Sequence, residues 1–143
     1  MKRFVIDPAA LLHLANNGYR PDPGHQLVAP NSIRSAALDL LLQGVRDGEI
    51  TEPQALELHE LITALKIRLL GDRVSRGTAW KIAREQNGDS IRHAEYLALT
   101  LLQADALVAL DPGLVAFAEG VVPLAPVTEL FPETGQGSNP QPS

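Results

Sequence analysis

A short apolar run followed by Asp-Pro occurs twice in the chain, and this repeated unit constrains the fold more than any other feature. Residues 4–6 (FVI) precede Asp7-Pro8, and residues 106–110 (ALVAL) precede Asp111-Pro112. A fully apolar, β-prone run is typical of a strand buried on both faces of a parallel sheet. Aspartate before proline is typical of a helix N-cap with proline at the first helical position. Each unit therefore predicts a buried strand that passes into a helix.

Further helices and strands are predicted around these two units. We expect a strand over 26–29, a further strand over 121–127, and helices over 8–16, 30–43, 51–69, 75–86, 90–103 and 112–119. The strand over 121–127 contains prolines, which places it at an edge of the sheet. Strands that alternate with helices predict the α/β class, with a small parallel β-sheet flanked by helices on both faces. We predict one domain over residues 1–131 and a disordered, Pro/Gly/Ser-rich tail over 132–143.

Composition limits the partners of this domain. The chain has no cysteine, which excludes disulfides and thiolate metal sites and favours a reducing, cytoplasmic compartment. No stretch reaches the roughly 18 apolar residues that span a bilayer, so no membrane partner is expected. The net charge of −5 argues against a module that holds DNA by bulk electrostatics. It is compatible with a nuclease, whose metal site is built from carboxylates.

The two aspartates are the main candidates for chemistry. Asp7 and Asp111 each follow a predicted buried strand, and ligands of open α/β sheets bind outside the carboxyl ends of the strands. If the two strands are neighbours, both carboxylates project into one crevice. Paired carboxylates suit Mg²⁺ or Mn²⁺, which polarises a phosphodiester and generates hydroxide. The alternative is that each aspartate only caps its helix, a contribution of roughly 1 kcal/mol.

Three segments together resemble the PIN domains of VapC-type toxin ribonucleases. They are FVIDPAALLHLA, LVAPNSIRSAALDLLL and IRHAEYLALTLLQADALVALDPGL, and the resemblance spans about residues 4–127. It implies that Asp7 is the first acidic metal ligand and that Asp111 is the last. The family's glutamate falls at Ala36, which cannot bind a metal, and the family's aspartate in an Asp-Ala-x-Tyr motif falls at His93.

The resemblance implies a metal-dependent endoribonuclease, the toxin half of a toxin–antitoxin pair. Its partners would be an RNA substrate, an antitoxin protein that occludes the acidic cleft, and a second copy in a homodimer. Asp39 or His93 would complete the site. Asp39 lies one helical turn after Ala36, and His93 is able to bind metal as neutral imidazole or to act as an acid or base. Glu95 lies about 200° from His93 around the helix and is a poorer substitute.

Two other functions remain open from the sequence. Ala36 and His93 support a degenerate PIN-like domain that binds RNA or a protein without cleavage, because Mg²⁺ demands a nearly complete oxygen shell. The chain is otherwise a structural domain whose Asp-Pro pairs only cap helices. A Mn²⁺ or Mg²⁺ titration separates the nuclease from the degenerate domain. Asp7→Asn separates the metal site from the structural domain: it abolishes metal binding with little loss of stability if Asp7 is a ligand, and it leaves every RNA activity unchanged if Asp7 only caps its helix, because asparagine also caps well.

A cluster of cations and the single tryptophan complete the candidates. The cations are Lys66, Arg68, Arg73, Arg76, Lys81 and Arg84. They form either an ordinary solvated face of two helices or the edge of a groove for phosphates. Trp80 is predicted to lie in the core or between helices, with base stacking as the alternative.

Overall fold

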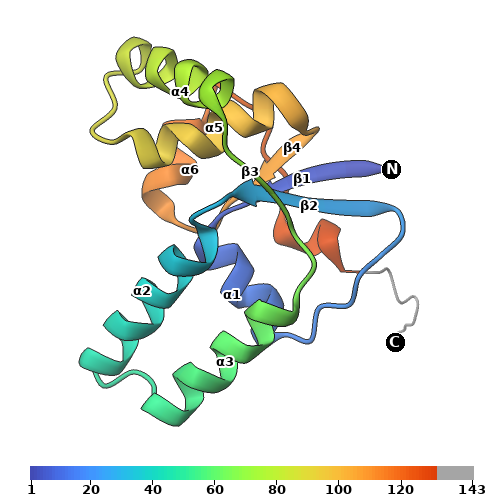
Figure 1. Cartoon of the computed structure of the whole chain (residues 1–143), viewed down its shortest axis with the longest axis vertical. Helices are drawn as coiled ribbons and strands as arrows, with labels where there is room; N and C mark the ends of the chain where they lie inside the picture. Colours follow the sequence, from blue (N-terminus) through green and yellow to red (C-terminus); the bar gives the residue numbers. More distant parts are fainter. Residues whose placement is uncertain (132–143) are drawn as a thin grey trace, which may run out of the picture.

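A small parallel sheet runs through the centre of the computed structural model, which describes residues 1–131 (Figure 1). Its strands are β1 (Lys2–Ile6), β2 (His25–Pro30), β3 (Arg68–Leu70) and β4 (Ala106–Val108), in the order β3-β2-β1-β4. Every neighbouring pair is parallel. The neighbouring strands β1 and β4 supply Val5 and Leu107, whose side chains are fully buried.

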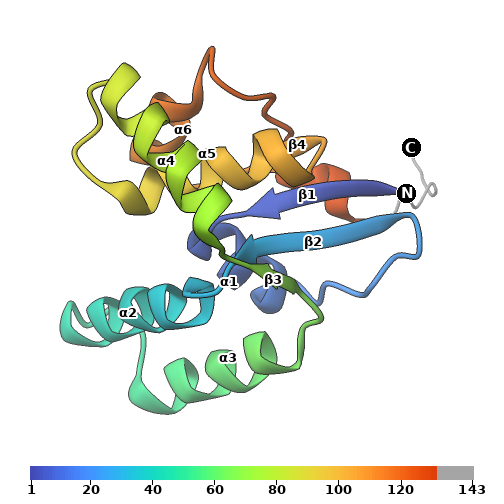
Figure 2. The same cartoon turned by 45° about the horizontal axis from the view of Figure 1, so that its top comes forward.

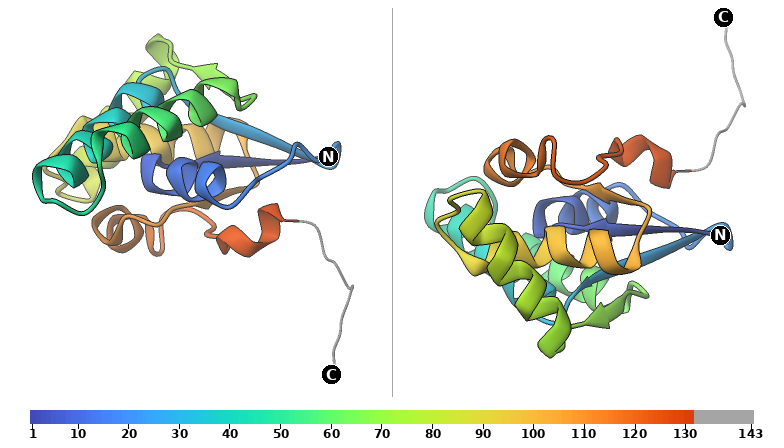
Figure 3. Two further views of the ribbon diagram at one scale, coloured as in Figure 1. Left: turned by 90° about the horizontal axis from the view of Figure 1, so that it is seen from below. Right: turned by 90° about the horizontal axis from the view of Figure 1, so that it is seen from above.

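Helices cover both faces of this sheet (Figure 2). On one face lie α1 (Pro8–Asn16), α2 (Ile33–Arg46) and α3 (Glu52–Ala64). On the other face, α5 (Ile91–Gln103) contacts β1, β2 and β4, and α4 (Arg73–Glu85) packs on the outside of α5 (Figure 3). The short α6 (Pro112–Ala118) follows β4 and contacts α5. The predicted α/β class, with helices on both faces of a parallel sheet, is confirmed.

The helix starts follow from their capping residues. Asp7 accepts a hydrogen bond from the Ala10 N–H at 2.7 Å, and Asp111 accepts one from the Leu114 N–H at 2.9 Å. Both Asp-Pro pairs therefore cap their helices as predicted. The predicted capping box of α3 is also present, since Thr51 and Gln54 each bond the other's backbone N–H.

The helix predicted over 51–69 is wrong in its last five residues, 65–69. It ends at Ala64, and residues 68–70 form the edge strand β3 instead. The physical reason is a long-range contact: Arg34 donates to the carbonyl oxygens of Ile62 at 3.1 Å and Leu65 at 2.7 Å. These carbonyls belong to the last turn, so the guanidinium satisfies them where the helix stops.

The strand predicted over 121–127 is also wrong, although its edge position is correct. Only Leu124 forms a bridge, to Leu107 of β4, and the 3₁₀ helix η1 (Val127–Leu130) follows. Pro123 and Pro126 have no N–H to donate, which prevents a longer ladder. Among residues 1–131, the helices are too short or too polar to cross a membrane. The tail predicted to be disordered, residues 132–143, lies outside the described residues.

Candidate functional site

The two Asp-Pro units meet at the carboxyl edge of the sheet. Asp7 directly follows β1, Asp111 follows β4, and β1 and β4 are parallel neighbours. The backbone N–H of Asp111 donates to Asp7 Oδ2 at 2.9 Å. Both residues line a cleft of about 210 Å³ bounded by the starts of α1, α5 and α6 and by α2. The juxtaposition expected from the sequence is present in the fold.

Both carboxylate oxygens of Asp7 accept hydrogen bonds from the backbone. The residue is fully buried, and it accepts from the N–H groups of Ala10 at 2.7 Å, Asp111 at 2.9 Å and Leu110 at 3.1 Å. Burial raises the pKa of the Asp7 carboxyl, and these hydrogen bonds oppose the rise. A buried carboxylate is stable only when it is paired in this way. Asp7 therefore joins the β1–α1 junction to the β4–α6 junction.

Asp111 is the accessible carboxylate of the pair. Its side chain is 49% exposed, and one oxygen, Oδ2, both caps α6 and lies 3.7 Å from His93 Nε2. Gly113 leaves room for this approach, because a Cβ there would lie 3.2 Å from Asp111 Oδ2 and 3.6 Å from His93 Cε1. The His93 ring and the Asp111 carboxylate thus form a solvent-accessible pair at the mouth of the cleft.

Tyr96 contributes a buried hydroxyl without a partner. The residue is 5% exposed and lines the cleft, and its hydroxyl has no hydrogen-bond partner among the described residues. Burial raises the pKa of Tyr96, and the charges of Asp7 and Glu95 raise it further, so the hydroxyl stays protonated at neutral pH. An unpaired buried hydroxyl costs about 1–3 kcal/mol. A water or a ligand atom that accepts a hydrogen bond therefore belongs in this cleft.

The remaining residues proposed for the site divide into those inside the cleft and one outside it. Ala36 and His93 line it, as the resemblance implies, whereas Asp39 is exposed on α2 and is not among the lining residues. Glu95 lines it as well, although helical spacing placed it far from His93. The cleft lies against the N-terminal end of α5, so side chains from several sides of this helix line it.

Sequence reasoning missed two lining residues on this turn. Arg92 and Tyr96 flank His93 and complete the wall that α5 provides. The signal for Tyr96 was present, because it occupies the tyrosine position of the motif that His93 begins. Nothing in the sequence distinguished Arg92 from any other helix-surface cation.

These donors do not amount to a resident site for Mg²⁺ or Mn²⁺. Within residues 1–131, no three histidine or acidic side chains converge in a way that would hold a metal ion. Asp7 has its oxygens committed to N–H groups, and Ala36 provides no donor. The ligands that remain are Asp111, the His93 imidazole and Glu95 at the rim, fewer than the oxygen shell that Mg²⁺ prefers.

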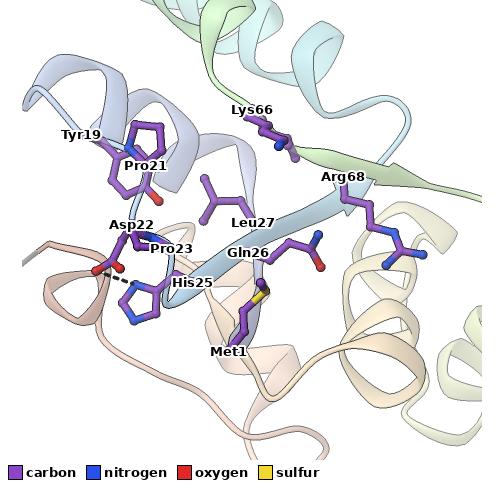
Figure 4. A pocket seen from close by; sticks show the side chains of 11 residues that line it. Met1, Tyr19, Pro21, Asp22, Pro23, His25, Gln26, Leu27, Lys66 and Arg68 are labelled. Atoms are coloured by element: carbon purple, nitrogen blue, oxygen red, sulfur yellow. Dashed lines mark ion pairs between the residues drawn. The ribbon is translucent and has the colours of Figure 1, made fainter.

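A larger hollow of about 630 Å³ lies at the opposite end of the sheet, beside the start of β2 (Figure 4). Lys66 and Arg68 approach it from one side, and the segment from Tyr19 to His25 approaches from the other (Figure 4). Gln26 Oε1 and His25 Nδ1 are buried there without a hydrogen-bond partner among the described residues. Lys66 and Arg68 of the predicted cation cluster lie here, whereas none of the residues proposed for the acidic site lines this hollow.

Comparison with known proteins supports the architecture. No protein-family model matches the chain, and no curated protein matches its sequence. The crystal structure of PAE2754 from Pyrobaculum aerophilum is similar, with a TM-score of 0.65 and 18% sequence identity over 90% of this chain and 93% of that chain. A likeness at this identity concerns the fold alone, so it assigns no activity.

Proposed function

We propose that this chain is a PIN-like domain that binds single-stranded RNA in the cleft between α1, α5 and α6, without metal-dependent cleavage. Arg92 and the Tyr96 hydroxyl donate to a phosphate, and the Asp111 carboxylate accepts from a ribose hydroxyl. The 2′-hydroxyl is both donor and acceptor, so a cleft with donors on one wall and a carboxylate on another favours RNA over a bare anion.

The observation that carries this proposal is the state of Asp7. The residue that the family resemblance makes the first metal ligand is fully buried and bonds three backbone N–H groups. It therefore acts as a structural link. The accessible groups of the cleft are then mostly suited to hydrogen bonding with RNA.

Anisotropy of a labelled single-stranded RNA tests this proposal. Arg92→Gln weakens binding by about 10- to 100-fold, because it removes a charged hydrogen bond. Tyr96→Phe weakens it by about 3- to 10-fold while leaving the free energy of unfolding unchanged or higher, because the orphaned hydroxyl is lost. Arg20→Gln, an exposed cation in the α1–β2 loop, is the matched control. RNA binding that neither cleft variant changes would refute the proposal, and no binding at all would support a purely structural domain.

The second candidate is a metal-dependent endoribonuclease, the toxin half of a toxin–antitoxin pair. Asp7 and Asp111 favour it, because they meet at one sheet edge in the order that the resemblance implies. Mg²⁺ is often bound by one or two carboxylates together with substrate phosphates. In this case Asp111 and His93 hold the ion only when RNA is present, an antitoxin covers the cleft, and the protein works as a homodimer in the cytoplasm.

Calorimetry separates the two candidates. Mn²⁺ is titrated into the protein alone and into its complex with a non-cleavable single-stranded oligonucleotide. In a separate incubation with the protein and Mn²⁺, a cleavable single-stranded RNA is examined on a gel. Intact RNA and no heat at millimolar Mn²⁺ support the binding domain. Metal-dependent cleavage that Asp111→Asn abolishes supports the ribonuclease, and the proposal of a non-cleaving domain is then abandoned.

A further inference from the structure

The outer face of α4 concentrates positive charge. Arg73, Arg76, Lys81 and Arg84 are all exposed on this helix, and its only carboxylate is Glu85. The buried side is formed by Ser75, Ala79, Ile82 and Ala83. No described carboxylate pairs with any of the four cations within 4.0 Å. Four unpaired cations on one helix stand out in a chain whose net charge is −5.

Trp80 lies in the middle of these cations. It was predicted to be buried, but the structure leaves it 61% exposed. Arg76 and Arg84 are one helical turn before and after it, so both are neighbours of the indole on the helix surface. An indole this exposed beside two arginines offers an aromatic face on which a nucleobase stacks.

The helix surface one turn before Trp80 is open. A Cβ at Gly77 would meet no atom within 4 Å, the Trp80 side chain included, so nothing covers this position. Arg73, Gly77, Trp80 and Arg84 follow one another along a single stripe of the helix, about 16 Å long. An open aromatic surface between cations is the arrangement that stacks nucleobases while it holds phosphates.

The stripe continues toward the cleft. A hollow of about 240 Å³ lies beside Trp80 and Arg84, and its far wall is the start of α5 at Ser90 and Ile91. The next residue, Arg92, lines the cleft. A chain that leaves the cleft at Arg92 therefore reaches the hollow and then Trp80 without crossing an acidic helix. Asp89 is the single carboxylate on the wall of the hollow.

We propose that the exposed stripe of α4, together with the flanking Arg76 and Lys81, binds single-stranded nucleic acid by stacking a base on the indole of Trp80. This inference deepens the proposed RNA-binding function, because it assigns a second contact for the same strand. The occupant is a polyanion with planar groups: the cations account for the charge, and the indole accounts for the planarity.

Tryptophan fluorescence tests the stripe directly, because Trp80 is the only tryptophan in the chain. Short oligouridylate is titrated in the presence of a chelator, which prevents metal-dependent cleavage. Stacking quenches the emission, and duplex RNA or polyglutamate at equal charge leaves it largely unchanged. Equal quenching by polyglutamate would overturn the proposal in favour of an acidic protein partner.

Variants measured by anisotropy of a labelled oligonucleotide complete the test. Trp80→Leu weakens binding by about 5- to 100-fold, the range for one lost base stack, and Trp80→Phe retains most of the affinity. Arg76→Gln with Arg84→Gln lowers the slope of log K against log salt by about 1.4, since each phosphate contact on a single strand contributes about 0.7. Arg20→Gln with Arg46→Gln removes the same charge from exposed positions elsewhere and leaves the affinity within about twofold.

The outcomes separate this inference from the proposed function. Binding that responds to Arg92→Gln but leaves Trp80 emission and the α4 variants unaffected overturns the stripe and leaves the cleft proposal intact. Quenching of Trp80 with no response to the cleft variants supports the stripe and overturns the cleft proposal.

Discussion

Replacing Asp7 by asparagine tests whether this carboxylate holds the two strand–helix junctions together. The substitution keeps the shape of the side chain and exchanges one carboxylate oxygen for an NH₂ group. Asp7 Oδ1 accepts from the Ala10 N–H at 2.7 Å and Oδ2 accepts from the Asp111 N–H at 2.9 Å, while the Leu110 N–H is shared between Oδ2 at 3.1 Å and Oδ1 at 3.2 Å. In either orientation of the amide, the new NH₂ therefore points at one or more buried N–H donors.

The expected loss is worked from the cheaper orientation. With the amide oxygen toward Leu110 and Asp111, only the N–H of Ala10 loses its acceptor, which costs about 1–3 kcal/mol. Removal of a buried charge offsets part of this cost, so Asp7→Asn should lower the free energy of unfolding by about 1–2 kcal/mol. Asp7→Ala orphans all three donors, and the loss should rise to about 3–5 kcal/mol. The sequence-based expectation of little loss on Asp7→Asn is therefore revised.

Urea unfolding at neutral pH, followed by far-UV circular dichroism, measures these losses. Fluorescence is the weaker reporter, because Trp80 is already 61% exposed in the folded state. The slope of the free energy against urea should stay constant, so that the midpoint alone reports stability. If the free energy of unfolding of Asp7→Asn lies within about 0.5 kcal/mol of the wild-type value, the three hydrogen bonds do not stabilise the junction and the reasoning fails.

Four further predictions use the same unfolding assay. Asp111→Asn should change stability by less than about 0.5 kcal/mol, because asparagine caps as well as aspartate at this half-exposed site. Gly88→Ala should cost about 1–3 kcal/mol, since its Cβ would meet the Phe117 ring at 2.9 Å. Gly77→Ala should instead gain about 0.5–1 kcal/mol, because open space receives the methyl group. The free energy of unfolding of wild type should exceed that of Asp7→Asn by the largest amount below pH 3.8, and this difference should shrink as the pH rises through the raised pKa of Asp7 in the folded state. A difference that grows as the pH rises would show that the N–H hydrogen bonds outweigh burial in setting this pKa.

The elements that the sequence predicted well are those whose ends carry local signals. The helix over 8–16 begins at an Asp-Pro pair and ends before Gly18, and the structure agrees at both ends. The helix over 91–103 follows Ser90, whose hydroxyl accepts from the Arg92 N–H. Capping residues act within one turn of their own position, so a single sequence is enough to find them.

The elements that the sequence predicted poorly depend on distant partners. Residues 68–70 become a strand because β2 pairs with them, and α3 ends where Arg34 reaches its last carbonyls. Arg34 is 31 positions away from Leu65, so no local pattern announces this contact. Leu69 matched the apolar spacing of the helix, which extended the prediction in error.

The candidate site shows the same division. Parallel pairing of β1 with β4 brings Asp7 and Asp111 together, which the repeated unit predicted only on the condition that the two strands are neighbours. The sequence did not show that the Asp7 carboxylate would accept hydrogen bonds from the backbone N–H groups of the other unit. These hydrogen bonds form only if the ends of β1 and β4 lie level with each other. The strand register, which places Ile6 opposite Val108, decides this. Tertiary geometry therefore decides whether this aspartate is a ligand or a structural link.

The net charge of the chain argues against nucleic-acid binding, whereas the distribution of its charges favours it. A polyanion responds to the local potential, because at physiological ionic strength charges more than about 8 Å apart are largely screened from one another. The carboxylates of α3, at Glu52, Glu57 and Glu60, lie in the layer on the other face of the sheet (Figure 2). The cations of α4 lie along one face of one helix, so each acts on the phosphates nearest to it while those carboxylates contribute little. Affinity should accordingly fall with the loss of α4 cations and not with the overall charge of the protein, which is what the paired charge variants measure.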